Sequence, residues 1–301
     1  MKTDLNDLTA FVAVARASGF REAARATNTS ASRLSDAVRR LESRLGVRLF
    51  HRSTRSVVVT EAGASLLERV SPVMNELDSA LDSVNHYRGK PAGKLRLHVP
   101  VSAAKLILPA IVPPFLAAYP DIELEVVADS NVINVFEAGC DAGIRYDERL
   151  EQDMIAVPIG PRRQRFATAA APALLDRLGR PEHPRDLLEY PCIGGRYRSG
   201  VASAWEFEKD GQVIEIQPAG PLTVSVGSAV DLAVDAAVAG TGVITLFEQW
   251  LRPYLDCGQL EPVLESWWQS FSGPYLYYSG RRLAPTPLLA FIDFLRKMEA
   301  E

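Results

Sequence analysis

The chain has 301 residues and a formal net charge of −4, and it is long enough to form two or three domains with separate apolar cores. Its polar start and its lack of a long apolar run argue against a signal peptide and a membrane partner, so we expect a cytoplasmic protein. Cys140, Cys192 and Cys257 are widely spaced, which predicts reduced thiols and no metal site, cofactor or disulfide framework.

Charge is distributed unevenly along the chain. Residues 1–60 hold 11 Lys and Arg against 5 Asp and Glu, a net of +6, whereas the remaining 241 residues hold 22 against 32, a net of −10. This asymmetry predicts one module that faces a polyanion and another that does not. A cationic domain that is merely solvated would show the same charge, so DNA binding needs further support.

Three helices are predicted in the first part of the chain. Apolar residues recur at helical spacing over 5–15, and an alanine-rich helix follows over 21–27. Ser30 is a suitable N-cap for a third helix, and Gly46 is a suitable end for it. Small residues in the second helix allow the close crossing that a helix-turn-helix requires.

The outward face of the third helix is the main candidate for a DNA contact. Leu34, Val38 and Leu41 form its inward stripe, which leaves hydroxyl and guanidinium groups on the other side. Such groups bind phosphates and read base edges, and Asp36 either accepts from cytosine or pairs with a neighbouring arginine. The candidate contacts are Ser30, Ser32, Arg33, Ser35, Asp36, Arg39 and Arg40.

A two-stranded wing is predicted next. Residues 47–50 and 56–59 are apolar and flank the polar run 51–55. The tip would approach a neighbouring phosphate or the minor groove. Its candidate contacts are Arg52, Thr54 and Arg55.

A long helix over 61–88 is predicted to join the two parts of the chain, and a hinge over 87–93 follows it. Apolar residues recur along the helix at alternating steps of three and four, which indicates a coiled-coil seam between two copies of the chain. A helix packed on its own chain is the alternative. The candidate seam residues are Leu67, Val70, Met74, Leu77, Leu81 and Val84.

From residue 95 onwards strands alternate with helices, which predicts a mostly parallel α/β sheet. One helix is expected from about 100 towards 119, and another over 131–138. Segments 154–159 and 165–169 are expected to cross into a second lobe, where 204–207 and 213–216 form a hairpin over Asp210 and Gly211, and the chain returns at 275–297. Two such lobes bind small molecules between them, at the carboxyl ends of strands.

Ser102 follows a strand at a predicted helix start, where backbone amides attract anions, and Ser228 has the equivalent place in the second lobe. The glycine-rich segment 194–200 is predicted to be a flexible cationic loop. The candidate effector contacts are Val101, Ser102, Arg145, Tyr146, Arg196, Tyr197, Ser228 and Phe247.

The ordered run from Phe20 to Gly63 resembles the signature of LysR-type transcriptional regulators. The residues that carry the resemblance are Ser35, Arg39-Arg40-Leu41-Glu42, Leu45-Gly46-Val47-Arg48-Leu49-Phe50, Arg52, Thr54-Arg55 and Thr60-Glu61-Ala62-Gly63. The resemblance implies an α/β chain with an N-terminal winged helix-turn-helix, a long linker helix and a two-lobed effector domain like a type 2 periplasmic binding protein. The implied domains are 1–60 for DNA binding, 61–92 for the dimerising linker and hinge, and 93–301 for effector binding. Within the last, lobe one spans about 93–160 and 267–301, and lobe two spans about 161–266.

The resemblance also implies a function. Such a regulator binds double-stranded operator DNA as a homodimer or homotetramer and responds to a small anionic or aromatic effector in the cleft of its C-terminal domain. RNA polymerase is a further partner that the resemblance allows.

Three other functions are less well supported. An enzyme is disfavoured because Ser102 lacks a nucleophile-elbow context and no histidine lies in a catalytic or metal pattern, so no catalytic residue is expected. A pure solute-binding protein does not explain the DNA-binding module, and an architectural DNA-binding protein does not explain the two-lobed domain.

Overall fold

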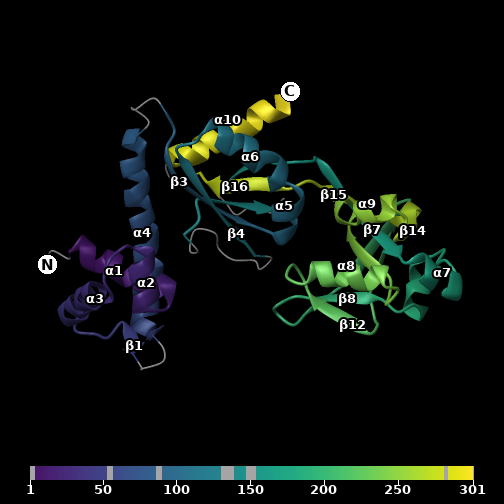
Figure 1. Cartoon of the computed structure of the whole chain (residues 1–301), viewed down its shortest axis with the longest axis horizontal. Coiled ribbons are helices and arrows are strands. Elements are labelled where there is room, and N and C mark those ends of the chain that lie inside the picture. The colour runs from purple at the N-terminus through teal and green to yellow at the C-terminus, as the bar shows by residue number, and fades with distance from the viewer. Residues whose placement is uncertain are drawn as a thin grey trace. The chain divides into compact units, whose positions relative to one another are not determined.

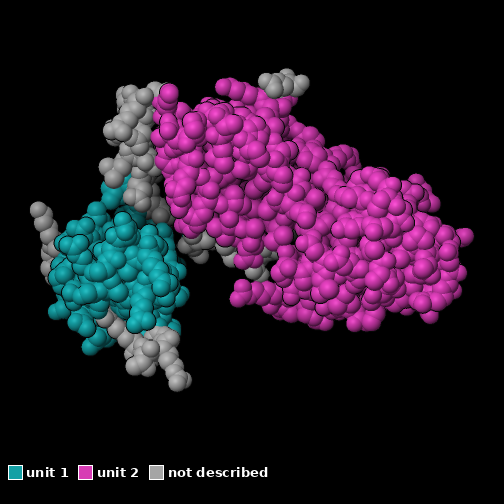
Figure 2. Space-filling model, in the orientation of Figure 1, with its two compact units in different colours: residues 1–89, 134–139 teal, residues 90–133, 140–301 magenta. Residues whose placement is uncertain are grey.

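The computed structural model describes residues 4–52, 57–85, 90–129, 139–146, 154–280 and 284–300. The chain forms two compact units, which Figure 2 colours separately: residues 1–89 with 134–139, and residues 90–133 with 140–301. None of the described helices combines the length and the apolar character that a membrane crossing requires.

Three helices form the core of the first unit: α1 (Leu5–Ala17), α2 (Phe20–Ala26) and α3 (Ala31–Leu45) (Figure 1). The Ser30 hydroxyl accepts the backbone N–H of Arg33 at 3.2 Å, and Gly46 ends α3 in the left-handed region with φ of 71°. Both predicted ends of this helix are therefore confirmed. Its inward residues Val38 and Leu41 are completely buried.

The wing is an antiparallel pair of β1 (Phe50–Arg52) and β2 (Val57–Val59). The predicted first strand over 47–50 is wrong in position, because the strand begins three residues later. The wing tip, residues 53–56, lies outside the described residues.

The strand β1 starts late because the backbone groups of the two residues before it have hydrogen-bond partners outside a strand. The Leu49 N–H donates to the Glu42 carboxylate at 2.9 Å, and the Leu49 carbonyl accepts the Thr60 N–H at 2.9 Å. The Arg48 carbonyl accepts the Thr60 hydroxyl at 2.8 Å. These groups therefore bond to α3 and to the start of the next helix rather than to a neighbouring strand.

The long helix α4 (Glu61–Asn85) begins at Thr60, whose hydroxyl accepts the Gly63 N–H at 3.0 Å. A Cβ on Gly63 would stand 2.2 Å from the Leu49 carbonyl oxygen, so only glycine allows this approach. The Thr60–Gly63 motif thus fixes the wing against the first turn of α4.

We expect Gly63→Ala to destabilise the first unit by about 1–3 kcal/mol, because the added methyl must displace backbone. Denaturant unfolding followed by circular dichroism measures the effect. Ala64→Ser, an exposed change in the same turn, should leave the midpoint near that of the wild type. An unchanged midpoint for Gly63→Ala would contradict the close contact.

The first part of the predicted seam packs on its own chain. Leu67 and Val70 are half-buried against the core of α1, α2 and α3. For these two residues the structure agrees with the alternative prediction, a helix packed on its own chain. Leu77 remains 37% exposed. The backbone of Leu81 and Val84 belongs to α4.

Lobe one of the second unit is a five-stranded sheet in the order β4-β3-β5-β16-β6. Its strands are β3 (Gly93–Val99), β4 (Ile122–Ala128), β5 (Ala142–Arg145), β6 (Met154–Pro158) and β16 (Tyr275–Ser279). Helices α6 (Leu108–Ala118) and α10 (Thr286–Ala300) pack together over this sheet, with Phe115 and Phe291 at 4.9 Å between ring centroids (Figure 1). The single predicted helix after residue 100 is two helices, because α5 (Val101–Leu106) ends before Ile107 and α6 begins after it.

Lobe two centres on β7 (Arg163–Ala170), which pairs antiparallel with β13, β14 and β15. The bounds of these strands are Ile244–Phe247, Glu261–Val263 and Ser270–Ser272. Its helices are α7 (Pro172–Leu178), α8 (Val230–Val238) and α9 (Glu248–Asp256), with 3₁₀ turns at Pro184–Glu189 and Glu265–Trp267.

Two smaller sheets complete lobe two. The first has the order β12-β8-β9, with bounds Leu222–Ser225, Ile193–Arg196 and Ala202–Ser203. The second is the predicted hairpin, formed by β10 (Trp205–Lys209) and β11 (Gln212–Ile216). Its turn residues Asp210 and Gly211 both have positive φ, at 51° and 78°, as a tight hairpin turn requires.

Three expectations need correction. The segment 194–200 is not wholly a flexible loop, since residues 193–196 form β8, where Gly195 pairs with both β12 and β9. Parallel pairing holds for β4, β3 and β5, whereas the strands on β7 are antiparallel. Helix α8 begins at Val230, so Ser228 lies in the preceding turn.

The predicted helix over 131–138 lies outside the described residues.

Candidate nucleic-acid interface and effector cavity

The exposed face of α3 presents hydroxyl and guanidinium groups. Ser32, Ser35 and Arg39 follow each other at steps of three and four, so they lie along one line of the helix. The Arg39 side chain is 67% exposed and stands 3.9 Å from Asp36, a contact that solvent screens strongly. This face can therefore exchange its internal ion pair for phosphate or base contacts.

Arg40, a predicted DNA contact, binds within the unit. Its guanidinium donates to the carboxylate of Asp7 from Nη2 at 2.7 Å and from Nε at 3.2 Å, and the pKa of Arg40 is raised by this hydrogen bond. Arg44 donates to the other Asp7 oxygen at 3.2 Å. Asp7 is completely buried, so the two arginines compensate its charge and hold α1 on α3.

Glu42 is a structural residue that the sequence analysis missed. Its buried carboxylate accepts the N–H groups of Leu49 and Phe50 at 2.9 and 3.3 Å, and Arg48 lies 3.8 Å away. The side chain thereby fixes the start of the wing relative to α3. The sequence feature that could have predicted this role is the position of Glu42, an acidic residue directly after the inward-facing Leu41.

The predicted contacts of the wing are only partly described. Arg52 ends β1 opposite Val57, whereas Thr54 and Arg55 lie outside the described residues. The Ser30 hydroxyl caps α3, so this predicted DNA contact has a structural role in the helix.

A cavity of about 570 Å³ lies in the second unit and is lined from both lobes, a size suited to a small molecule. Four predicted effector contacts line it: Ser102, Tyr146, Tyr197 and Phe247.

The four other predicted effector residues are absent from the described lining of this cavity. Val101 packs against the core of lobe two, and the Arg145 guanidinium stacks over Tyr277 at 4.8 Å. Arg196 donates to the Gly200 carbonyl at 2.9 Å, and Ser228 is exposed.

An aromatic cluster forms part of the cavity wall. Tyr146, Phe166, Phe247 and Phe271 have ring centroids 4.8 to 6.2 Å apart. Tyr146 follows β5 directly, and Phe166, Phe247 and Phe271 lie on β7, β13 and β15. Phe166 and Phe271 could not be predicted from the sequence, because only the pairing of distant strands brings these rings together.

Buried polar groups lie beside this cluster. Burial raises the pKa of Tyr146, and Ser102 and Gln164 are close enough to offset part of that rise. Neither the Tyr146 hydroxyl nor either amide atom of Gln164 completes a hydrogen bond within the described part of the chain. Gln164 is only 5% exposed, so these groups lack solvent as a substitute.

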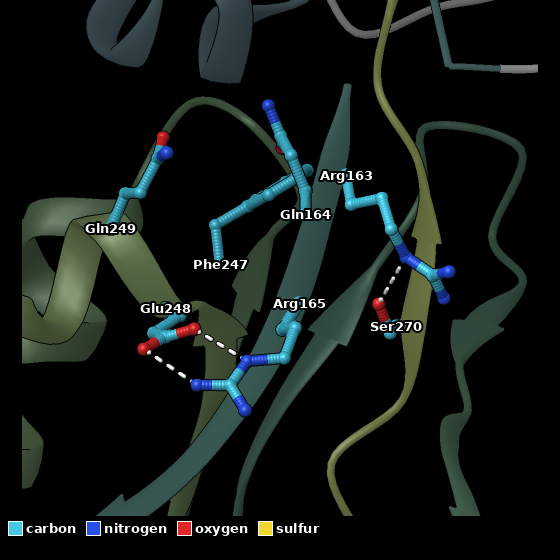
Figure 3. Close-up of a pocket in the computed structure, with 7 residues that line it drawn as sticks. All are labelled: Arg163, Gln164, Arg165, Phe247, Glu248, Gln249 and Ser270. Carbon is cyan, nitrogen blue, oxygen red and sulfur yellow. Dashed lines mark hydrogen bonds and ion pairs between the residues drawn. The ribbon is translucent and has the colours of Figure 1, made fainter. Parts of the chain in front are cut away.

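A second hollow of about 250 Å³ lies between β7 and the start of α9 (Figure 3). The Arg165 guanidinium donates to both oxygens of Glu248, at 2.7 and 2.9 Å, and Arg252 also contacts this carboxylate. Arg163 donates from Nε to the Ser270 hydroxyl at 3.2 Å. The arginines thus hold β7 against α9 and β15.

We expect Glu248→Gln to lower stability at neutral pH by about 0.5–1.5 kcal/mol, a small effect because Arg165 is partly solvated. Arg165 lowers the pKa of Glu248 below its ordinary 4.5 in the folded chain. The ion pair therefore contributes its full stabilisation above pH 4.5. This stabilisation is lost as the pH falls through the lower pKa that Glu248 has in the folded chain. Denaturant unfolding at several pH values, with Glu208→Gln as an exposed control, measures it. A difference that persists at the lowest pH would contradict the ion pair.

Comparison with known proteins agrees with this architecture. Residues 5–64 match the bacterial regulatory helix-turn-helix protein, lysR family, and residues 88–300 match the LysR substrate binding domain. YcaN of Escherichia coli (strain K12), an uncharacterized HTH-type transcriptional regulator, is 38% identical over 98% of this chain and 96% of its own length. The HTH-type transcriptional regulator PgrR of the same organism is 33% identical over 98% of each chain.

Solved structures share the fold. The full-length Vibrio cholerae virulence activator AphB has a TM-score of 0.65 and 22% identity, covering 98% of this chain and 99% of AphB. CrgA, a LysR-type transcriptional regulator from Neisseria meningitidis, has a TM-score of 0.59 and 26% identity over 100% of both chains. The expected fold class is therefore confirmed. With both matched regions in one chain, the protein belongs to the LysR family of DNA-binding transcriptional regulators with an effector-binding domain.

Proposed function

We propose that this regulator binds operator DNA as an oligomer through α3 and the wing, and that a small molecule in the cavity of the second unit controls this binding. The observation that carries the proposal is the line of Ser32, Ser35 and Arg39 on a capped helix of a helix-turn-helix, in which Ser32 and Arg39 are exposed and Ser35 is half-buried. A helix of this kind fits the major groove, where hydroxyl and guanidinium groups bind phosphates and read base edges.

We assign three functional regions to the chain. Residues 1–60 bind DNA, 61–92 form the dimerising linker and hinge, and 93–301 bind the effector, with lobe two at about 161–266. The start of α4 at Glu61 and of β3 at Gly93 supports these boundaries, as does the division of the chain into units at residue 90.

The proposed dimer uses the later part of α4. Leu67 and Val70 pack on the first unit itself, so the contact between copies is assigned to Met74, Leu77, Leu81 and Val84. Two copies bring two recognition helices to two half-sites, which is how dimeric helix-turn-helix proteins reach their operators. A homotetramer, a contact with RNA polymerase and a cytoplasmic location belong to the same proposal.

Binding of the full-length protein to duplex DNA tests the function. We expect a fragment from upstream of its own gene to bind about 10³-fold or more tightly than a scrambled duplex at physiological salt. Affinity for both should fall as salt rises, since each phosphate contact releases counterions. Equal affinity for the two duplexes at every salt concentration would overturn the proposal of a sequence-specific regulator.

A further inference from the structure

The cavity of the second unit lacks a cationic wall. Among the described residues that line it, Glu206 alone has a charged side chain. A carboxylate ligand would therefore find no opposite charge on these walls, and burial of an unpaired charge is costly.

The cationic side chains near the cavity already have other partners. Arg165 is bidentate with Glu248, and Arg196 donates to a backbone carbonyl. Lys105 stands over the Trp250 ring at 5.5 Å and lies 3.7 Å from Asp231. An anionic ligand would have to break such contacts to recruit a positive charge.

The start of α8 does not change this balance. Gly227 and Val230 line the cavity, and the N-terminus of a helix carries about half an elementary charge. That partial charge suits a carbonyl or hydroxyl oxygen. It compensates only part of the charge of a carboxylate, and the like charge of Glu206 opposes that gain.

The remaining lining favours an aromatic ligand with one polar end. The rings of Tyr146, Phe166, Phe247 and Phe271 offer faces and edges for stacking. Ser102 and Tyr146 bring hydroxyl groups that both donate and accept. The Tyr146 hydroxyl belongs to a lining residue and has no hydrogen-bond partner in the described part of the chain, which indicates a polar group that the ligand supplies.

We propose that this cavity binds an uncharged aromatic molecule bearing a carbonyl, carboxamide or hydroxyl group, rather than the small anion expected from the sequence. The inference rests on the proposed function, because it names the class of ligand for the same effector site. The aromatic part of the ligand lies against the aromatic cluster, and the polar group of the ligand bonds to Ser102 and Tyr146.

Three probes of nearly equal shape test the charge preference: benzamide, benzoate and benzamidinium. We expect isothermal titration of the full-length protein to show benzamide binding at least about tenfold more tightly than either ion. Tyr146→Phe should weaken benzamide binding by about 2- to 12-fold, since it removes one hydrogen bond. Tyr119→Phe removes the same hydroxyl from a half-buried tyrosine of lobe one that is absent from the described lining of the cavity, so it is the matched control and should have little effect.

The other outcomes overturn the inference. Benzoate binding as tightly as benzamide would mean that the cavity accepts an anion. Tightest binding of benzamidinium, abolished by Glu206→Gln, would mean that it selects a cation. No binding of any probe at millimolar concentration would contradict an aromatic site. Since none of these titrations contains DNA, each can fail while sequence-specific operator binding persists.

Discussion

Arg39→Ala is expected to weaken operator binding by about 1–3 kcal/mol, which is roughly 5- to 150-fold in affinity. The reason is the position of Arg39 on the exposed side of α3, where the proposed binding mode brings its guanidinium to a base edge or a phosphate. Fluorescence anisotropy with labelled duplex at several salt concentrations distinguishes the two. Loss of a phosphate contact lowers the salt slope by about one, whereas loss of a base contact mainly relaxes sequence preference.

Arg296→Ala in α10 is the matched control. Arg296 also lies on a helix, has an aspartate three residues earlier at 3.6 Å and is 62% exposed, close to the 67% of Arg39. The control removes the same charge from the second unit and should leave operator affinity unchanged. If both variants bind like the wild type, α3 does not contact DNA through Arg39.

Leu77→Asp is expected to convert the proposed dimer to a monomer, raising the dissociation constant of the dimer by about 100-fold or more. In a paired seam the two copies of residue 77 would bring opposed carboxylates into an apolar contact, which costs several kcal/mol. Sedimentation velocity over a range of protein concentrations measures the change. Operator affinity should fall with it, since a monomer reaches only one half-site.

Ser65→Asp is the control on the same helix. Ser65 is exposed and lies on the side of α4 opposite the assigned seam, so its replacement should leave the dimer intact. A dimer that survives Leu77→Asp would contradict the assigned seam. Dissociation by both variants would contradict its register.

Features that depend on neighbouring residues could be predicted from the sequence. The cap at Ser30, the end of α3 at Gly46 and the turn at Asp210 and Gly211 were all predicted correctly. In each case a side chain or a glycine acts on backbone within a few residues, so the local pattern contains the information.

Features that depend on distant partners were missed or misplaced. The glycines of 194–200 predicted a loop, yet residues 193–196 form β8 because β12 and β9 pair with them. The wing strand was placed too early because Glu42 and Thr60 occupy the backbone groups before Phe50. No local pattern predicts such partners.

The effector cavity shows the same division. Ser102 and Tyr146 were predicted because each follows a strand of an α/β sheet, where ligands bind. Arg145 was predicted for the same place after a strand and Arg196 for its cationic loop, but Arg145 stacks on Tyr277 and Arg196 bonds to Gly200. Phe166 and Phe271 became visible only when β15 was seen to pair with β7.

The sequence by itself determined that this protein has a helix-turn-helix followed by an α/β effector domain, because helical periodicity, caps and an ordered motif are encoded over short distances. Only the tertiary structure decided that Arg40 compensates a buried Asp7 and that the cavity wall is aromatic and without a cation among its described residues. Those properties depend on side chains that are far apart along the chain and meet only when strands pair and helices pack.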